Sequence, residues 1–172
     1  MSESPDSRLL DNEHHILHSI EVARRARARG NHPFGAILVG PDGKVLIEAE
    51  NTVVTEHDRT GHAERNLMTR ASRQFDDGFL ARCTMYTSTE PCAMCAGATY
   101  AVGIGLVVYA LSESALNRMI PQDPEDPLID FKCRTVLGVG PRRIEVLGPA
   151  YEDEARLVHE GFWGPSPPFP TG

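Results

Sequence analysis

Two separate motifs would have to meet in the folded chain to form a metal site, and this requirement limits the folds open to the sequence. His62 begins the run His-Ala-Glu, and Cys92 and Cys95 belong to the run Pro-Cys-Ala-Met-Cys. Zinc prefers imidazole nitrogen and thiolate sulfur as ligands, and catalytic zinc sites typically have three protein ligands and one open position. We therefore predict that these three side chains hold Zn²⁺.

Both motifs are predicted to lie where helices begin. Pro91 suits a first helical turn, and the spacing of the cysteines puts Cys92 and Cys95 on one face of that turn. The positive end of a helix also favours thiolate over thiol. A second helix, with apolar residues at helical spacing, is predicted to begin near His62. Its first turn carries Glu64, which is not needed as a ligand and is free to transfer protons.

A structural zinc site would need a fourth protein ligand, for which Cys83 and Cys133 are the candidates. Cys83 stands in an apolar run typical of a buried strand, where free cysteine behaves as a small hydrophobic residue. Cysteine is also among the residue types most often fully buried. We predict packing roles for both cysteines, and a catalytic rather than a structural zinc site.

Length and composition predict a single domain over residues 1–172, because a chain of about 150 residues can bury nearly 70% of its unfolded surface. No apolar run is long enough to span a membrane, and residues 1–11 are polar and acidic, unlike a signal peptide. Thiolate ligands fit a reducing compartment. We expect a cytoplasmic protein that does not bind membranes.

The net charge of −7 disfavours a nucleic-acid partner, because proteins that bind phosphates normally have a basic surface. The exception is residues 24–29, which include four arginines: Arg24, Arg25, Arg27 and Arg29. Cations are favourable at the end of a helix, and this run has no aromatic residues on which bases could stack. We interpret it as a solvated helix face rather than an RNA-binding patch.

The apolar pattern predicts alternating helices and strands. A Pro-Asp-Gly-Lys turn at residues 41–44 should join two strands as an antiparallel hairpin. A strand, the cysteine helix and another strand should form a crossover with parallel strands. The predicted strands are residues 34–39, 45–50, 84–87, 106–109 and 143–147, and the predicted helices are residues 13–29, 62–75, 91–102 and 151–160. An exposed acidic loop is predicted at residues 121–127.

The order of the motifs resembles the cytidine deaminase superfamily, in which H-x-E is followed by P-C-x-x-C. The likeness runs from Pro33-Phe34-Gly35-Ala36 through Asn51, the His62 motif and Thr89-Glu90-Pro91-Cys92 to Tyr109. It lies within the branch of guanine deaminase, cytosine deaminase and tRNA adenosine deaminase. The resemblance implies an α/β fold: a three-layer α/β/α sandwich around a five-stranded mixed sheet, usually assembled as a dimer or larger oligomer.

The resemblance also implies a zinc-dependent hydrolytic deaminase of a purine or pyrimidine base or nucleoside. Zinc can lower the pKa of bound water from about 15.7 to roughly 7, which gives a hydroxide nucleophile at neutral pH. Glu64 would move a proton from this water to a ring nitrogen of the substrate and then to the departing amine. Ammonia would leave and a carbonyl would remain.

The same resemblance suggests substrate contacts. Asn51 matches an asparagine that hydrogen-bonds the base, and Phe34 matches an aromatic residue that lines the pocket. Glu113 matches, approximately, the acidic residue with which guanine deaminases read the amino edge of guanine. Ala63 and Trp163 complete the expected contacts. A turn residue and a core aromatic are the alternative roles of Asn51 and Phe34 respectively.

The substrate is left open between a small base and tRNA. The run from Glu90 to Gly97 resembles the tRNA enzymes, whereas Ala98-Thr99-Tyr100-Ala101 is closer to the guanine-type pattern. The tRNA enzymes usually end in a basic, Phe-rich helix, but this chain ends in an acidic and then an aromatic segment. We therefore favour a guanine- or cytosine-type deaminase, with tRNA adenosine deamination as the alternative. A non-catalytic, zinc-stabilised RNA-binding module is a further alternative, but it leaves the free glutamate unexplained.

Residues 162–172 have two interpretations. They begin with Phe162-Trp163 and continue in a Pro-rich run that disfavours a helix. In related base deaminases a C-terminal segment closes over the pocket, so Trp163 is a candidate lid residue. Large aromatic side chains also commonly anchor a last helix to the core, which is the alternative.

Overall fold

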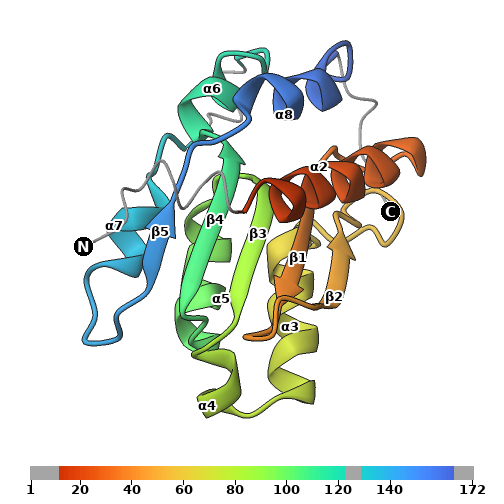
Figure 1. Cartoon of the computed structure of the whole chain (residues 1–172). Helices are drawn as coiled ribbons and strands as arrows, with labels where there is room; N and C mark the ends of the chain where they lie inside the picture. Colours follow the sequence, from red (N-terminus) through yellow and green to blue (C-terminus); the bar gives the residue numbers. More distant parts are fainter. Residues whose placement is uncertain (1–11, 123–128, 165–172) are drawn as a thin grey trace.

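Five short strands form one mixed sheet with helices on both faces (Figure 1). The computed structural model describes residues 12–122 and 129–164. The strands are β1 (Gly35–Val39), β2 (Val45–Glu50), β3 (Thr84–Thr89), β4 (Leu106–Leu111) and β5 (Glu145–Leu147). The helices are α2 (Glu13–Ala28), α3 (Ala63–Gln74), α4 (Asp77–Leu80), α5 (Ala93–Val102), α6 (Glu113–Asn117), α7 (Cys133–Leu137) and α8 (Glu152–His159).

The strands follow the order β2-β1-β3-β4-β5 across the sheet. β1 runs antiparallel to both β2 and β3, whereas β4 is parallel to β3 and to β5. The predicted hairpin is therefore confirmed as the β1–β2 pair. α5 connects the parallel strands β3 and β4, as expected for a strand–helix–strand crossover. The five-stranded mixed sheet implied by the resemblance is confirmed.

β1 explains why the sheet needs a helix layer on each face, since all five of its residues are buried. Ile37 and Val39 belong to a core cluster shared with α2 and α8, whereas Ala36 and Leu38 belong to a cluster shared with α3, α5 and α7. Burying an aliphatic side chain typically contributes about 1.5–3 kcal/mol. The two helix groups cover opposite faces (Figure 1), which confirms the three-layer α/β/α sandwich.

Gly35 allows α2 to lie close against β1. A Cβ atom at Gly35 would lie 2.3 Å from the backbone nitrogen of Ala23 and 2.6 Å from the carbonyl oxygen of Ser19. The Gly35 amide also donates to Ser88 Oγ of β3 at 3.1 Å. Because these atoms belong to the backbone of a packed helix, they cannot move aside cheaply. The backbone directly after Phe34 is fixed in this way.

The structure differs from the predicted elements mainly in short segments. α4, α6 and α7 were not expected, because four or five residues are too few to show helical periodicity. β3 continues to Thr89 and β4 to Leu111, so both strands extend two residues beyond their predicted ends. Residues 123–127 of the expected acidic loop lie outside the described residues.

Cys83 and Cys133 are buried in the same core cluster, with relative exposures of 1% and 0%. Neither belongs to the group of side chains that could hold a metal. Their predicted packing roles agree with this burial. Among the described helices, none is long and apolar enough to cross a membrane.

Candidate metal centre and catalytic site

The two sequence motifs meet where α3 and α5 begin, next to the carboxyl end of β3. His62 immediately precedes α3 and Cys92 immediately precedes α5, so each is the N-cap residue of its helix. Neither side chain caps its own helix, and both are therefore available to the site. Cys95 lies in the first turn of α5 and is fully buried. The prediction that the motifs lie at helix starts is confirmed.

The three ligand atoms have the spacing of a tetrahedral zinc site. His62 Nδ1 lies 3.6 Å from Cys92 Sγ and 3.7 Å from Cys95 Sγ, and all three atoms lie within 4.8 Å of one another. Zn–S bonds of about 2.3 Å and Zn–N bonds of about 2.0–2.1 Å imply a tetrahedral N···S separation of about 3.6 Å. The geometry therefore fits Zn²⁺. No other group of this kind occurs among residues 12–122 and 129–164.

The two thiols have opposite tendencies to ionise. Hydrogen bonding from Cys95, and also from His62, lowers the pKa of Cys92 to about 4. The hydrogen bond with Cys92, followed by burial, raises the pKa of Cys95. The protein alone therefore accommodates one thiolate, and a second one needs compensating positive charge nearby. A divalent cation would supply that charge, which is a further reason why the donor set suits zinc.

Glu64 lies in the first turn of α3 with only 4% of its surface exposed, and it is not one of the ligand group. Its Oε1 accepts a hydrogen bond of 3.0 Å from Thr87 Oγ1 of β3, which fixes the orientation of the carboxylate. Burial raises the pKa of Glu64, and the negative charge of Cys92 raises it further, against the opposing effect of His62. A carboxyl group with increased proton affinity beside a metal site is suited to proton transfer.

Asn51 is fully buried directly after β2, and its Nδ2 has no hydrogen-bond partner. Its Oδ1 accepts from the Val53 amide at 3.1 Å, and its own amide donates to the carbonyl oxygen of Phe34 at 3.1 Å. Both expected contacts, Asn51 and Phe34, are therefore neighbours across the β1–β2 edge. The free Nδ2 group is a buried donor that a ligand acceptor could satisfy, because such groups are rarely left unpaired.

A second asparagine holds the Asn51 loop against the site. Asn66 of α3 donates from Nδ2 to the carbonyl oxygen of Glu50 at 3.1 Å and to Thr52 Oγ1 at 3.0 Å. The Thr52 amide donates to the carbonyl oxygen of Gly61 at 2.8 Å, immediately before the first ligand. These hydrogen bonds hold the start of the loop between β2 and α3 against its end. They thereby fix the position of Asn51.

An aromatic cluster links Phe34 to the end of the chain. The ring centroid of Phe34 lies 5.3 Å from that of His159 and 6.1 Å from that of Trp163. His32 joins the cluster, with its ring 5.7 Å from Trp163. Burial lowers the pKa of His32, and the nearby charge of His62 lowers it further. The cluster therefore reaches from the tail to the neighbourhood of the metal ligands.

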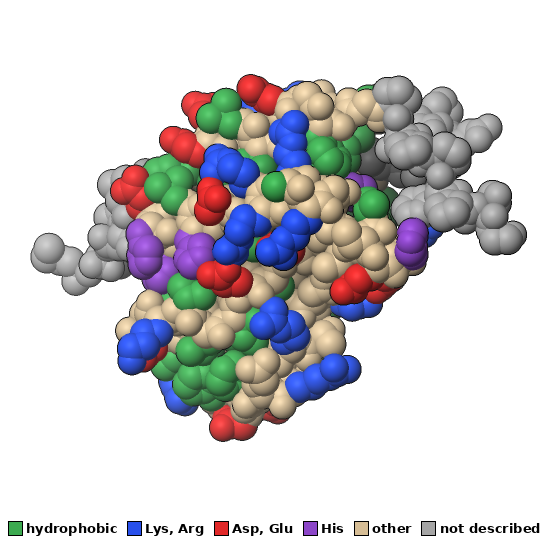
Figure 2. Space-filling view, turned by 90° about the vertical axis from the view of Figure 1, so that its right-hand side faces the viewer, with side chains coloured by type: hydrophobic (Ala, Val, Ile, Leu, Met, Phe, Trp, Pro, Cys, Tyr) green, Lys and Arg blue, Asp and Glu red, His purple; other side chains and the backbone are tan. Residues whose placement is uncertain are grey.

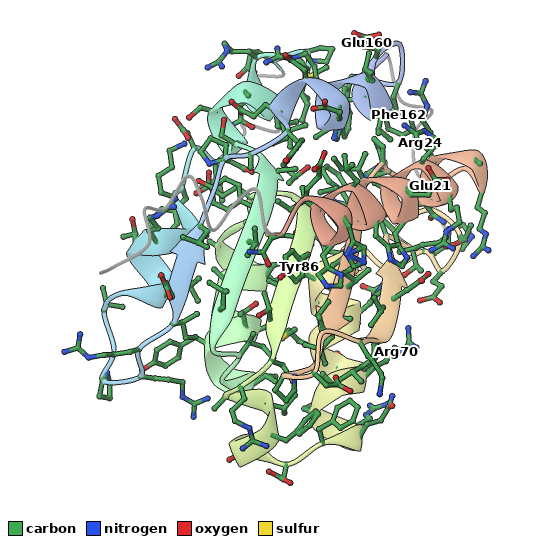
Figure 3. All side chains as sticks on the ribbon, in the orientation of Figure 1. Glu21, Arg24, Arg70, Tyr86, Glu160 and Phe162 are labelled. Carbon is green, nitrogen blue, oxygen red and sulfur yellow. The ribbon has the colours of Figure 1, made fainter. Side chains whose placement is uncertain are left out.

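Trp163 is attached to the last helix within its own chain. Its Nε1 donates to His159 Nδ1 at 3.3 Å, and the two rings stack at an interplanar angle of 11°. Phe162 lies between the end of α8 and α2 (Figure 3), with the Arg27 guanidinium 5.7 Å from the centre of its ring. These contacts attach the aromatic pair to α8 and α2, as the anchoring interpretation expects. Residues 165–172 lie outside the described residues.

Glu113 and Ala63 are both close to the ligand positions. Glu113 is the first residue of α6, two residues after the last residue of β4. Burial raises its pKa to about 7, and the negative charges of Cys92, Glu90 and Glu64 raise it in the same direction. Ala63, fully buried, is the first residue of α3 between the histidine and the glutamate. Backbone amides at this position have no partner within the helix.

Three of the four arginines of residues 24–29 are engaged with other elements. Arg25 pairs with Glu48 of β2, and Arg29 Nη1 lies 3.0 Å from Glu50 Oε2. Arg27 Nη1 donates to the carbonyl oxygen of Val158 at 2.7 Å. Lys and Arg side chains on the face that includes β2 lie among Asp and Glu side chains (Figure 2). The run is thus more than a solvated helix face, because it ties α2 to β2 and α8.

Several side chains that shape the site were not identified from the sequence: Thr87, Glu90, Asn66 and His32. Thr87 and Glu90 act through partners on other elements, so no local motif marks them. Asn66 bonds the Glu50 carbonyl and His32 packs against Trp163. Both contacts exist only in the folded chain, so the sequence does not indicate them. Only Glu90 lies inside a quoted motif, directly before Pro91-Cys92.

Comparison with known proteins places this geometry in a family. A family model for the zinc-binding region of cytidine and deoxycytidylate deaminases matches residues 10–111. A probable cytosine deaminase from Schizosaccharomyces pombe is 40% identical over 152 residues, which cover 87% of this chain and 90% of that protein. A tRNA-specific adenosine deaminase from Haemophilus influenzae is 32% identical over 98 residues, 57% of each chain.

The fold comparison gives the same result. The structure of a guanine deaminase from Nitrosomonas europaea superposes with a TM-score of 0.70, covering 86% of this chain and 82% of that one at 22% identity. This likeness shows a shared fold. With the family match and the fit of the ligand set to zinc, it supports one conclusion: the chain belongs to the cytidine and deoxycytidylate deaminase zinc-binding family.

Proposed function

We propose that the protein is a zinc-dependent hydrolytic deaminase of a free purine or pyrimidine base, of the guanine or cytosine type, or of the corresponding nucleoside. The observation that carries the proposal is the buried, unligated Glu64 carboxylate beside the His62, Cys92 and Cys95 cluster. A purely structural zinc site has no use for such a group, because burying a carboxylate is costly. A catalytic site uses it to transfer protons.

His62 Nδ1 and the two cysteine sulfurs would hold the zinc ion. When bound, zinc supplies a Lewis acid that makes water acidic enough to act as a nucleophile at neutral pH. Glu64 performs the proton transfers: Oε1 is held by Thr87 Oγ1, which leaves Oε2 to accept a proton and to donate it again. The raised pKa of Glu64 favours this alternation, because a good general acid and base has a pKa near the working pH.

We further propose that the substrate base lies between Asn51, Phe34, Ala63 and Glu113. Asn51 Nδ2 is a buried free donor and would bind an acceptor on the ring. The Phe34 ring would contact the face of the base, and the Ala63 amide is a second donor at the start of α3. Glu113, whose pKa is raised to about 7, would accept from an amino or ring N–H group as the carboxylate or donate as the acid.

The aromatic end of the chain is included in the proposal as one wall of the pocket. Trp163 lies against Phe34 and His32, and its attachment to His159 holds it there. We propose that residues 162–172, part of a single domain over residues 1–172, restrict access to the base. The family resemblance also supports a homodimer, and the four free cysteines support a cytoplasmic location.

A small substrate is favoured over tRNA by the surface charges. The arginines of residues 24–29 are paired with Glu21, Glu48 or Glu50, or with a backbone carbonyl, so they do not form a free basic stripe. The alternative, tRNA adenosine deamination, is supported by the identity to the Haemophilus influenzae enzyme. It requires phosphate contacts that a net charge of −7 disfavours.

Ammonia release from the purified zinc form tests the proposal. The assay uses guanine, cytosine, adenine, their nucleosides and a tRNA anticodon stem-loop at two salt concentrations. We expect turnover of one small base or nucleoside with little dependence on salt. Turnover of the stem-loop alone, falling steeply with salt, would replace the proposal by the tRNA alternative. Polyanion binding without turnover of any substrate would indicate a non-catalytic module.

A further inference from the structure

Glu90 lies at a junction between the metal site and two other segments. It follows the last residue of β3, and its own amide donates to the carbonyl oxygen of Leu111, the last residue of β4, at 2.7 Å. Pro91 and Cys92 come next in the chain, so the backbone of Glu90 leads directly into the ligand helix. The side chain is 2% exposed. A buried carboxylate at this position needs partners, and two backbone amides are among those it has.

Each oxygen of the Glu90 carboxylate accepts a backbone amide from a different segment. Oε2 accepts from the Glu113 amide at 3.2 Å, and Oε1 accepts from the Cys133 amide at 3.1 Å. These amides belong to the first residues of α6 and α7. Helices leave their first amides without internal partners, and a negative charge near them is favourable. The N-cap residue of α7, Lys132, provides no side-chain cap, so Glu90 takes that role from outside the segment.

Both α6 and α7 are connected to the metal site. α6 begins with Glu113, whose side chain lies near enough to Cys92 and Glu64 for their charges to raise its pKa. α7 packs against α5, the helix that carries Cys95. A displacement of the start of α6 would therefore move Glu113, the proposed substrate contact, and a displacement of α7 would disturb its packing against α5. The hydroxyl oxygen of Ser112, the residue before α6, accepts from the Ala115 amide, whereas the Glu113 amide donates to Glu90.

We propose that Glu90 is a positioning residue for substrate recognition: its carboxylate fixes the starts of α6 and α7 and thereby sets the place of Glu113 against the metal site. Glu90 itself does not contact the substrate. The inference rests on the proposed function, because it assigns Glu113 to the substrate. It adds that recognition of the base depends on Glu90, which lies two residues before the ligand Cys92 in the chain.

The test is a double-mutant cycle with Glu90→Gln and Glu113→Gln, assayed with guanine and with cytosine. Glutamine keeps one acceptor oxygen but turns an NH₂ group toward the second amide, so one hydrogen bond is lost and two donors oppose each other. We expect Glu90→Gln to retain the zinc content of the wild type and to lower kcat/KM about tenfold, mainly through KM. In the Glu113→Gln background it should lower kcat/KM by less than about twofold.

Multiplicative losses in the double variant would overturn the proposal, because Glu90 would then act independently of Glu113. So would an unchanged KM. Asp76→Asn is the matched control, since Asp76 Oδ1 likewise accepts a helix-start amide, that of Phe79 at 2.8 Å. α4 lies at the opposite end of the sheet from α6 (Figure 1), so this control should leave KM unchanged.

A second pair of variants decides the matter if Glu90→Gln does not fold. Cys133→Pro removes the amide that donates to Glu90 Oε1, whereas Cys133→Ala removes only the thiol. Proline suits the first position of a helix, and Lys132 has the extended backbone, ψ 127°, that a residue before proline needs. We expect a kcat/KM several-fold lower for the proline variant than for the alanine variant, and equal values would contradict the proposal.

Failure of all these variants to fold would assign Glu90 a structural role only and would also overturn the proposal. The proposed function is tested separately by the wild type and by Glu64→Gln with the same bases. If the wild type turns over a base and Glu64→Gln does not, the deaminase function holds whatever the Glu90 cycle gives. If the wild type releases no ammonia from any base, the proposed function itself is wrong.

Discussion

The hydroxyl of Thr87 and the carboxylate of Glu64 form the pair of side chains on which proton transfer depends. Thr87 Oγ1 lies 3.0 Å from Glu64 Oε1 and 3.1 Å from the carbonyl oxygen of Thr89. A hydroxyl has one hydrogen to donate. When Glu64 is a carboxylate, the hydroxyl can donate to Glu64 Oε1. When Glu64 is protonated, the hydroxyl can donate to the Thr89 carbonyl and its oxygen can accept a hydrogen bond from Glu64. One side chain can thus serve both protonation states.

Replacing Thr87 by valine removes this hydroxyl while keeping the shape of the side chain. The hydrogen bond from Thr87 lowers the pKa of Glu64, so its loss should raise that pKa further. The base form of Glu64 would then be reached only at higher pH, and the acidic limb of the kcat/KM profile should move to higher pH. We expect kcat at neutral pH to fall about tenfold. Profiles for the wild type and Thr87→Val that coincide would contradict this role.

Asn51 offers a more selective substitution than alanine. Asn51→Asp keeps the Oδ1 acceptor for the Val53 amide but replaces the free Nδ2 donor by an acceptor. If Nδ2 binds the substrate, kcat/KM should fall by at least about tenfold, because buried hydrogen-bonding groups discriminate strongly. The melting temperature and zinc content, measured on the same preparation, should stay near those of the wild type. An unchanged kcat/KM would leave Asn51 as a turn residue only.

At the scale of elements, α2 and β1 depend on the missing side chain of Gly35. Gly35→Ala places a Cβ atom within 2.3 Å of the Ala23 nitrogen, so α2 must shift away from the sheet. We expect a loss of about 1–3 kcal/mol in the free energy of unfolding, as for other overpacked sites. Gly97→Ala in α5 is the control, since no atom lies within 4 Å of its Cβ position. Urea denaturation should show it unchanged or more stable by up to about 1 kcal/mol.

The long elements could be predicted from the sequence because their apolar residues repeat with a clear period. α2, α3, α5 and the β1–β2 hairpin were predicted within two residues of their observed bounds. The one-turn helices α4, α6 and α7 could not be predicted, because their position depends on contacts made after folding. The Glu90 carboxylate, for example, supports the starts of both α6 and α7 from a distant part of the chain.

The ligand set could also be predicted, because metal chemistry requires particular residue types at a short spacing. The supporting residues could not, since a threonine on a strand or an asparagine on a helix is common and does not by itself indicate such a role. Thr87 gains its role only when β3 brings it beneath the first turn of α3. Glu113 was matched only approximately, because α6 was not expected; in the structure the charges of Cys92 and Glu64 are near enough to raise its pKa.

At the scale of the whole molecule, Phe162 and Trp163 connect the segment after α8 to His32 and Phe34 through the aromatic cluster. Deleting residues 162–172 would remove Phe162 and Trp163 from their contacts with His32 and Phe34. Because aromatic pairs typically contribute about 0.5–1.5 kcal/mol beyond their burial, we expect KM to rise about three- to tenfold while zinc is retained. Deleting only residues 165–172 is the matched control. Loss of zinc and folding in the longer deletion would leave the aromatic pair as an anchor without a role in binding.

The most direct measurement compares zinc content and ammonia release for the wild type and Glu64→Gln with the small base that the wild type turns over. We expect Glu64→Gln to fold, to bind as much zinc as the wild type, and to lose at least about a hundredfold in kcat. Glu56→Gln is the control, because it alters an exposed carboxylate that accepts a hydrogen bond from Thr52. It should keep the zinc content and the kcat of the wild type. Full turnover by Glu64→Gln, with zinc bound, would contradict the assignment of Glu64 as the group that transfers protons.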